Sequence, residues 1–135
     1  MPSFGVESQR HRETIDPKLQ GIVNEAIKIF DFSIICGFRN KEDQNKAYQT
    51  KQSKHHWPQS KHNRLPSKAV DLASWDSKLK QIDWFNHKRF ILLAGIIIGI
   101  AYMKDIKIRW GGDWDRDTFL GDENFLDLSH FELID

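Results

Sequence analysis

The sequence predicts an α+β fold, in which a small antiparallel sheet packs against two or three helices. Apolar residues make up 39% of the 135 residues and charged residues 29%, which is the balance of a globular protein. Helical and strand-like segments are mixed without the regular rhythm of a βαβ protein. No repeat or linker divides the chain, so we expect one domain over residues 1–135.

The clearest helix is predicted over residues 16–30. Asp16 is suited to cap it and Pro17 to begin it, and apolar residues follow at helical spacing. A buried strand is expected next, over residues 32–38. A short helix over residues 40–50 follows, because Asn40 can cap it and acidic residues fill its first turn.

A polar loop over residues 51–67 leads into a predicted strand over residues 68–74. The next element is a long helix from about Asp83 to Met103. Its apolar part is shorter than the roughly 20 residues that span a bilayer, so we expect a core helix and no membrane span. Further strands are predicted over residues 106–110 and 128–134.

Charge and cysteine content exclude several classes of protein. The formal net charge is +1, which gives no indication of a nucleic-acid partner or of docking on anionic lipid. The one cysteine, Cys36, excludes an internal disulfide and a thiolate-rich zinc cluster, and its apolar surroundings predict an inert thiol. The first residues lack the apolar segment of a signal peptide.

Asp71 lies between Val70 and Leu72 in a predicted strand, where an unpaired buried carboxylate would cost several kcal/mol. A salt bridge to arginine, an exposed strand face or a metal ion would each resolve this cost. His62 ends the polar loop that precedes the strand, and His130 lies in the last strand. Two histidines and a carboxylate are a ligand set that catalytic zinc uses.

The last strand adds two further polar groups near His130. Because side chains alternate along a strand, His130 and Glu132 face the same side. Asp127 precedes His130 by three residues and could take a proton from a metal-activated water. Spacing alone leaves the metal site and the salt bridge open as alternatives.

Five motifs occur in one order: SFG, GFRNKEDQ, SKHN followed by PSKAVDLA, RWGGDWD, and DLSHFEL. Together they resemble the D-alanyl-D-alanine/L-alanyl-D-glutamate zinc metallopeptidase family, and most closely its single-domain phage endolysin branch. The resemblance covers roughly residues 3–133. The chain departs from the family pattern in a longer spacer, NRLPSK, after the first histidine, and in Asp127 where some relatives have glutamate.

The resemblance implies that one zinc ion is bound by His62, Asp71 and His130. It implies that Asp127 is the catalytic acid/base. Arg39 would steady the substrate carbonyl and the oxyanion formed from it, and Ser60 would lie near the substrate or support the site. Glu132 has no role that the resemblance assigns, but it could orient a ligand histidine.

The implied substrate is a peptidoglycan stem peptide, cut by zinc-activated water between L-Ala and D-Glu. The alternatives are a D-Ala-D-Ala carboxypeptidase and a non-catalytic zinc- or wall-binding module. We expect a monomer that accumulates in the host cytoplasm and acts on the cell wall at lysis.

A second metal pattern lies in the polar loop after the third predicted strand. Asp113, Asp115 and Asp117 alternate like the first ligands of a calcium loop, but Thr118 stands where an EF-hand has glycine. We weigh a calcium site there against a solvated acidic loop.

Overall fold

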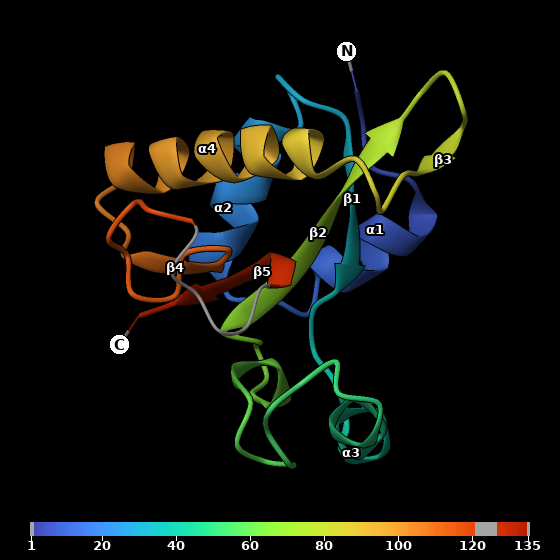
Figure 1. The fold of residues 1–135 in the computed structure, drawn as a ribbon, viewed down its shortest axis with the longest axis vertical. Coiled ribbons are helices and arrows are strands. Elements are labelled where there is room, and N and C mark those ends of the chain that lie inside the picture. Colours follow the sequence, from blue (N-terminus) through green and yellow to red (C-terminus); the bar gives the residue numbers. More distant parts are fainter. Residues whose placement is uncertain (1, 121–126, 135) are drawn as a thin grey trace.

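A computed structural model describes residues 2–120 and 127–134. An antiparallel sheet in the order β1-β2-β5-β4, with β3 paired to β2, organises the fold (Figure 1). The α+β prediction is confirmed. The strands are β1 (Phe32–Cys36), β2 (Ala69–Asp76), β3 (Gln81–Ile82), β4 (Ile108–Gly111) and β5 (Asp127–Leu133). The helices are α1 (Val6–Arg12), α2 (Pro17–Ala26), α3 (Lys41–Gln49), the 3₁₀ turn η1 (Lys61–Asn63) and α4 (His87–Met103).

Both predicted helix caps are present. Asp16 Oδ1 accepts a hydrogen bond from the backbone N–H of Lys18 at 2.8 Å, and Asn40 Oδ1 accepts one from Asp43 at 2.9 Å. The helix α1 was not predicted. Its only buried residue is Ser8, so it has no apolar stripe by which its sequence could indicate a helix.

The two faces of the sheet differ in polarity: one packs in the hydrophobic core and the other carries polar residues. Val70, Leu72 and Phe131 face the hydrophobic core, to which α2 and α4 also contribute. Asp71 and His130, which alternate with them, face the other side. The core therefore lies on one side of β2 and β5, and the polar residues singled out in the sequence lie on the other.

The long helix α4 packs against α2 and against β2, β4 and β5. Its inner face is buried, as predicted for a core helix. Its outer face is not: Leu92 is 56% exposed, and Tyr102 and Met103 are each 82% exposed. The helix is apolar on both faces because of its sequence, but only one face lies in the core. Among the described helices, none is both long enough and apolar enough to cross a membrane.

β4 and β5 lie close together at Gly111, which pairs with Asp127 at an irregularity in the ladder. A Cβ atom on Gly111 would lie 2.1 Å from the carbonyl oxygen of Asp127. No side chain fits at that distance, so the glycine allows the start of β5 to lie against β4. The position of Asp127 depends on this contact.

We predict that Gly111→Ala lowers the free energy of unfolding by more than 1 kcal/mol, because the backbone of β5 must move away. The matched control is Gly95→Ala on α4, where a Cβ meets nothing within 4 Å. Alanine there should be neutral or stabilising by up to about 1 kcal/mol. Urea denaturation of both variants measures the difference, and equal effects would contradict the close approach.

Candidate metal centre

A cleft of about 840 Å³ opens on the polar face of the sheet. All the site residues predicted from the sequence line it: Arg39, Ser60, His62, Asp71, Asp127, His130 and Glu132. They come from separate segments, namely the loop after β1, the turn η1, and the strands β2 and β5. The fold therefore brings the predicted set together.

His62 is held by the turn η1 and is almost fully buried. Ser60 begins this turn: its Oγ accepts a hydrogen bond from the N–H of His62 at 3.2 Å, and its own N–H donates to Asn63 Oδ1 at 3.0 Å. On the ring, Nδ1 lies 2.7 Å from the carbonyl oxygen of Gly37. A carbonyl only accepts, so Nδ1 carries a proton and Nε2 faces the cleft.

His130 is held by its other ring nitrogen, Nε2, and not by Nδ1 as in His62. Its Nε2 lies 2.9 Å from Glu132 Oε1, so this nitrogen carries a proton and Nδ1 is directed to Asp71. The pairing of β2 with β5 places Asp71 and His130 directly opposite each other. The role that the sequence left unassigned to Glu132 is therefore, on this geometry, to orient His130.

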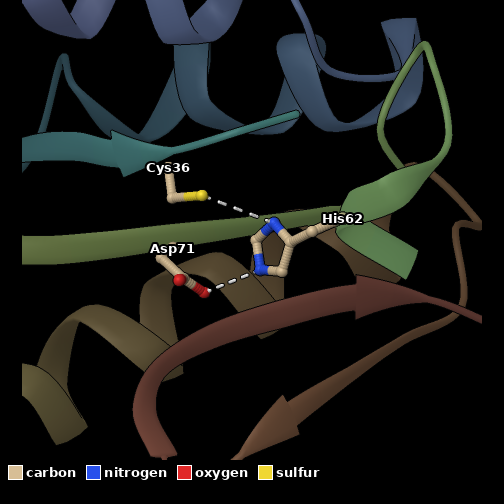
Figure 2. Close-up of side chains that lie close together, drawn as sticks. All are labelled: Cys36, His62 and Asp71. Carbon is tan, nitrogen blue, oxygen red and sulfur yellow. Dashed lines mark hydrogen bonds and ion pairs between the residues drawn. The ribbon is translucent and has the colours of Figure 1, made fainter. Parts of the chain in front are cut away.

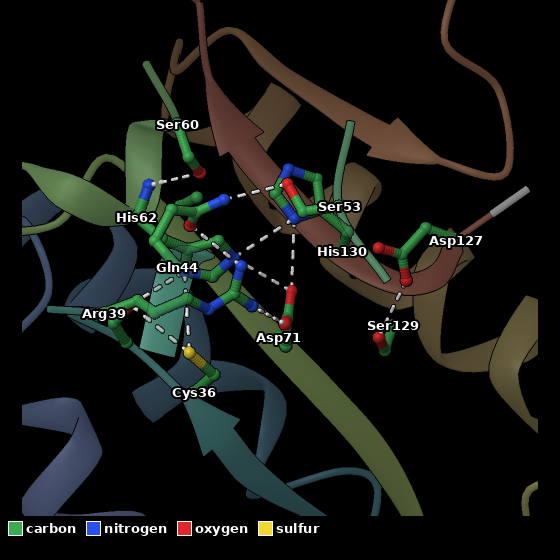
Figure 3. Close-up of polar contacts among 12 residues, drawn as sticks. Cys36, Arg39, Gln44, Ser53, Ser60, His62, Asp71, Asp127, Ser129 and His130 are labelled. Atoms are coloured by element: carbon green, nitrogen blue, oxygen red, sulfur yellow. Dashed lines mark hydrogen bonds and ion pairs between the residues drawn. The ribbon is translucent and has the colours of Figure 1, made fainter. Parts of the chain in front are cut away.

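Three atoms converge at the base of the cleft (Figure 3). Asp71 Oδ1 lies 3.1 Å from His62 Nε2 and 3.1 Å from His130 Nδ1, and the two nitrogens are 3.3 Å apart. With the outer nitrogens protonated, all three atoms present lone pairs to one point. Such an arrangement is stable only with positive charge between them, supplied by protons or by a metal ion. The donor set therefore fits a cation.

The electrostatics of the metal-free cluster reflect this need for positive charge. Burial lowers the pKa of His62, but the Asp71 carboxylate outweighs it and the pKa rises to about 10. Burial likewise opposes protonation of His130, and Asp71 and Glu132 raise its pKa to about 9. Burial alone would raise the pKa of Asp71, yet the two imidazoles hold it far below the usual range.

Cys36 lies near His62, but it is beside Nδ1 of the ring and not beside Nε2, the nitrogen that faces Asp71 (Figure 2). Its Sγ is 3.8 Å from Nδ1, the nitrogen bound to Gly37, whereas Asp71 lies beside Nε2. An ion bound at Nε2 therefore meets Asp71 and His130, and not the thiol. This geometry is compatible with His62, Asp71 and His130 as ligands, and that ligand set stays a prediction.

Arg39 and Asp127 flank the cluster. Arg39 Nη2 lies 3.4 Å from Asp71 Oδ2, and Nη1 donates to Gln44 Oε1 at 3.1 Å. Asp127 Oδ1 accepts a hydrogen bond from Ser129 Oγ at 3.0 Å. Burial and the negative charge of Asp71 raise the pKa of Asp127. Its carboxylate is thus a stronger proton acceptor than an exposed aspartate.

Gln44 is a buried residue of this site that sequence reasoning missed. Its side chain bonds not only Arg39 but also Asn63, Ser53 and the carbonyl oxygen of His55. It thereby fixes the guanidinium and the loop that precedes η1. Gln44 and Ala47, three positions apart, are the only buried residues of α3, and that spacing in a polar helix was the available signal.

The acidic loop does bring Asp113, Asp115 and Asp117 close enough together to share a cation. Their carboxylates also accept backbone N–H groups from within the loop: Asp113 from Thr118, and Asp117 from Phe119. Calcium at this loop stays a prediction.

A buried pair of imidazoles with a carboxylate, beside a further carboxylate in an open cleft, defines a candidate metal-dependent hydrolase. The chain belongs to the phage L-alanyl-D-glutamate peptidase family, whose profile matches residues 2–134.

Two relatives accompany this match. The L-alanyl-D-glutamate peptidase of Escherichia phage T5 is 28% identical over 138 aligned positions, which cover 97% of each chain. The crystal structure of the Serratia marcescens L-Ala D-Glu endopeptidase ChiX has a similar fold, with a TM-score of 0.75 and 21% identity. That likeness covers 98% of this chain and 90% of ChiX.

We predict that the stability of the metal-free protein falls as the pH rises from about 6.5 through 10. Both histidines have folded-state pKa values above the unfolded value of about 6.5, so their protonated forms stabilise the fold and this stabilisation is lost at higher pH. Each proton lost contributes a slope of up to about 1.4 kcal/mol per pH unit.

Urea denaturation in the presence of chelator measures this slope. His62→Gln is the control, because it removes one of the two titrating groups and should give a shallower slope. A stability that does not change between pH 6.5 and 10 would contradict the predicted protonation of the cluster.

Proposed function

We propose that this chain is a zinc-dependent peptidoglycan peptidase, a phage endolysin that hydrolyses the L-Ala–D-Glu bond of stem peptides. The observation that carries the proposal is the convergence of three lone pairs, from His62, Asp71 and His130, in a member of this family. The bond follows from the name of the phage T5 relative, an L-alanyl-D-glutamate peptidase.

The zinc ion would be held by His62 Nε2, Asp71 Oδ1 and His130 Nδ1. Two imidazole nitrogens and one carboxylate oxygen leave a further position open, as in catalytic zinc sites. When bound, zinc lowers the pKa of a water molecule and polarises a carbonyl group. Gly37 and Glu132 fix the two ring tautomers, so both lone pairs are directed to the ion before it arrives.

The residues beside the cluster have complementary roles in the hydrolysis. Asp127 takes the proton of the attacking water, since its raised pKa suits a base that later returns the proton. The water oxygen bonds to the carbonyl carbon, the carbon–nitrogen bond breaks, and the proton passes to the departing amine. Arg39, next to Asp71, places positive charge where the carbonyl oxygen becomes negative.

We predict that Asp127→Asn retains stoichiometric zinc while hydrolysis of cell-wall fragments falls by about 10²- to 10⁴-fold, the usual contribution of acid–base catalysis. His62→Ala is the matched variant, which should lose both zinc and activity. Elemental analysis and wall digestion, with and without chelator, measure both quantities.

Unchanged turnover in Asp127→Asn would remove Asp127 from the mechanism, and loss of its zinc would make it a ligand instead. Stoichiometric zinc in His62→Ala would exclude that histidine from the ligand set. A metal-free protein that still digests the wall would refute zinc catalysis altogether.

The scissile bond is tested with purified stem peptides and mass analysis of the products. Cleavage between L-Ala and D-Glu releases a peptide that begins with glutamate. Release of a terminal D-Ala would identify a D-Ala-D-Ala carboxypeptidase, and zinc binding without any product would identify a non-catalytic module.

The remaining parts of the proposal concern the whole chain. Residues 1–135 would form a single zinc peptidase domain that acts as a monomer on the cell wall, after accumulating in the host cytoplasm. Calcium at Asp113, Asp115 and Asp117 is a second metal prediction, and calcium binding that survives loss of the zinc ligands would support it.

A further inference from the structure

A second arginine, Arg109, lies in the same cleft and has no part in the mechanism above. The β4–β5 ladder pairs Arg109 directly with Glu132, two residues from His130 on the same strand. Alternation along β4 leaves its neighbours Ile108 and Trp110 in the core and turns Arg109 to the polar face. The sheet register therefore places this guanidinium beside the metal cluster.

The Arg109 side chain is incompletely satisfied. Its Nε is buried and finds no hydrogen-bond acceptor in the described part of the chain. Glu132, opposite it in the ladder, already accepts from His130 Nε2 at 2.9 Å and lies 3.4 Å from Lys61 Nζ, and the positive charge of Arg109 helps to lower its pKa. A buried donor without an acceptor costs about 1–3 kcal/mol. Arg109 also lines the open cleft, where its guanidinium can meet an acceptor that a ligand brings.

The charge of the cleft favours an anionic ligand. Its lining holds three carboxylates, and two of them have cationic partners: Arg39 lies beside Asp71, and Lys61 beside Glu132. In all, five lysine and arginine side chains line the cleft, namely Arg39, Lys51, Lys54, Lys61 and Arg109. The described lining therefore holds more cations than carboxylates, and a bound zinc ion would add more positive charge.

The proposed substrate carries the matching group. Glutamate has two carboxyl groups, and the peptide can continue through only one of them. The other stays a free carboxylate a few bonds from the nitrogen of the scissile bond. A guanidinium matches a carboxylate with two parallel hydrogen bonds, which makes arginine the suitable partner for this group.

We propose that Arg109 binds the free carboxylate of the glutamate residue on the leaving side of the scissile bond. This inference rests on the proposed peptidase function and adds a specificity determinant to it. Arg109 thereby selects substrates whose glutamate is unmodified over those in which the carboxylate has become a carboxamide. Arg39 remains the arginine that acts on the scissile carbonyl.

The test compares two synthetic stem peptides that differ only in this group, a free carboxylate in one and a carboxamide in the other. We expect the zinc-loaded wild-type protein to prefer the carboxylate by about 10- to 100-fold in kcat/KM, the range for a charge-assisted hydrogen bond. Arg109→Gln should cut both peptides at one similar, low rate, with most of the loss for the carboxylate peptide in KM.

Lys51→Gln is the matched control, because it removes one positive charge from the same cleft and should keep the wild-type preference. Arg109→Lys keeps the positive charge but cannot donate two parallel hydrogen bonds to a carboxylate, so it should retain only part of the preference. If Arg109→Gln does not fold, Arg109→Lys is the variant on which the preference is measured. Bound zinc and thermal unfolding verify that each variant keeps its metal centre.

A wild-type preference that persists in Arg109→Gln, or one that is lost in Lys51→Gln instead, would overturn the assignment to Arg109. Equal wild-type cleavage of both peptides would refute the carboxylate subsite while leaving the peptidase function intact. Cleavage of neither peptide by the zinc-loaded protein would refute the proposed function, and this inference with it.

Discussion

The antiparallel pairing of β2 with β5 is the contact on which the rest of this structure depends. It sets Asp71 directly opposite His130, so that a carboxylate and an imidazole meet across the strands. A shift of one residue would turn the entire face of either strand over. Val70, Leu72 and Phe131 prevent such a shift, because each would leave the core for the cleft. The hydrophobic effect thus holds the geometry of a polar site.

The residues around the cluster also hold its histidines in place. The turn that carries His62 is capped by Ser60, a neighbour in the sequence, while the ring of His62 is fixed by a carbonyl group just after β1. Glu132 orients His130 from two residues away on the same face of β5. Each of the two candidate histidine ligands therefore has a hydrogen-bond partner that fixes its ring, in addition to its strand or turn. Such supports hold side chains ready for an ion before it binds.

The sequence predicted those features that depend on local pattern. The caps at Asp16 and Asn40 and the shared face of His130 and Glu132 follow from spacing that is visible along the chain. The helix α1 was missed because it carries no apolar stripe, and the role of Gln44 was missed because its partners lie outside its own helix. The exposed outer face of α4 was missed for a different reason. A helix that is apolar all round carries no pattern that tells the buried face from the open one.

The place of β5 in the sheet has a consequence for the timing of synthesis. β5 follows every other described element along the chain, yet it lies inside the sheet, between β2 and β4. The two histidines of the cluster are 68 positions apart. A nascent chain that has not yet released β5 from the ribosome has an open sheet and an incomplete ligand set. A chain that stops before β5 therefore lacks His130 and has only one of the two histidines of the cluster.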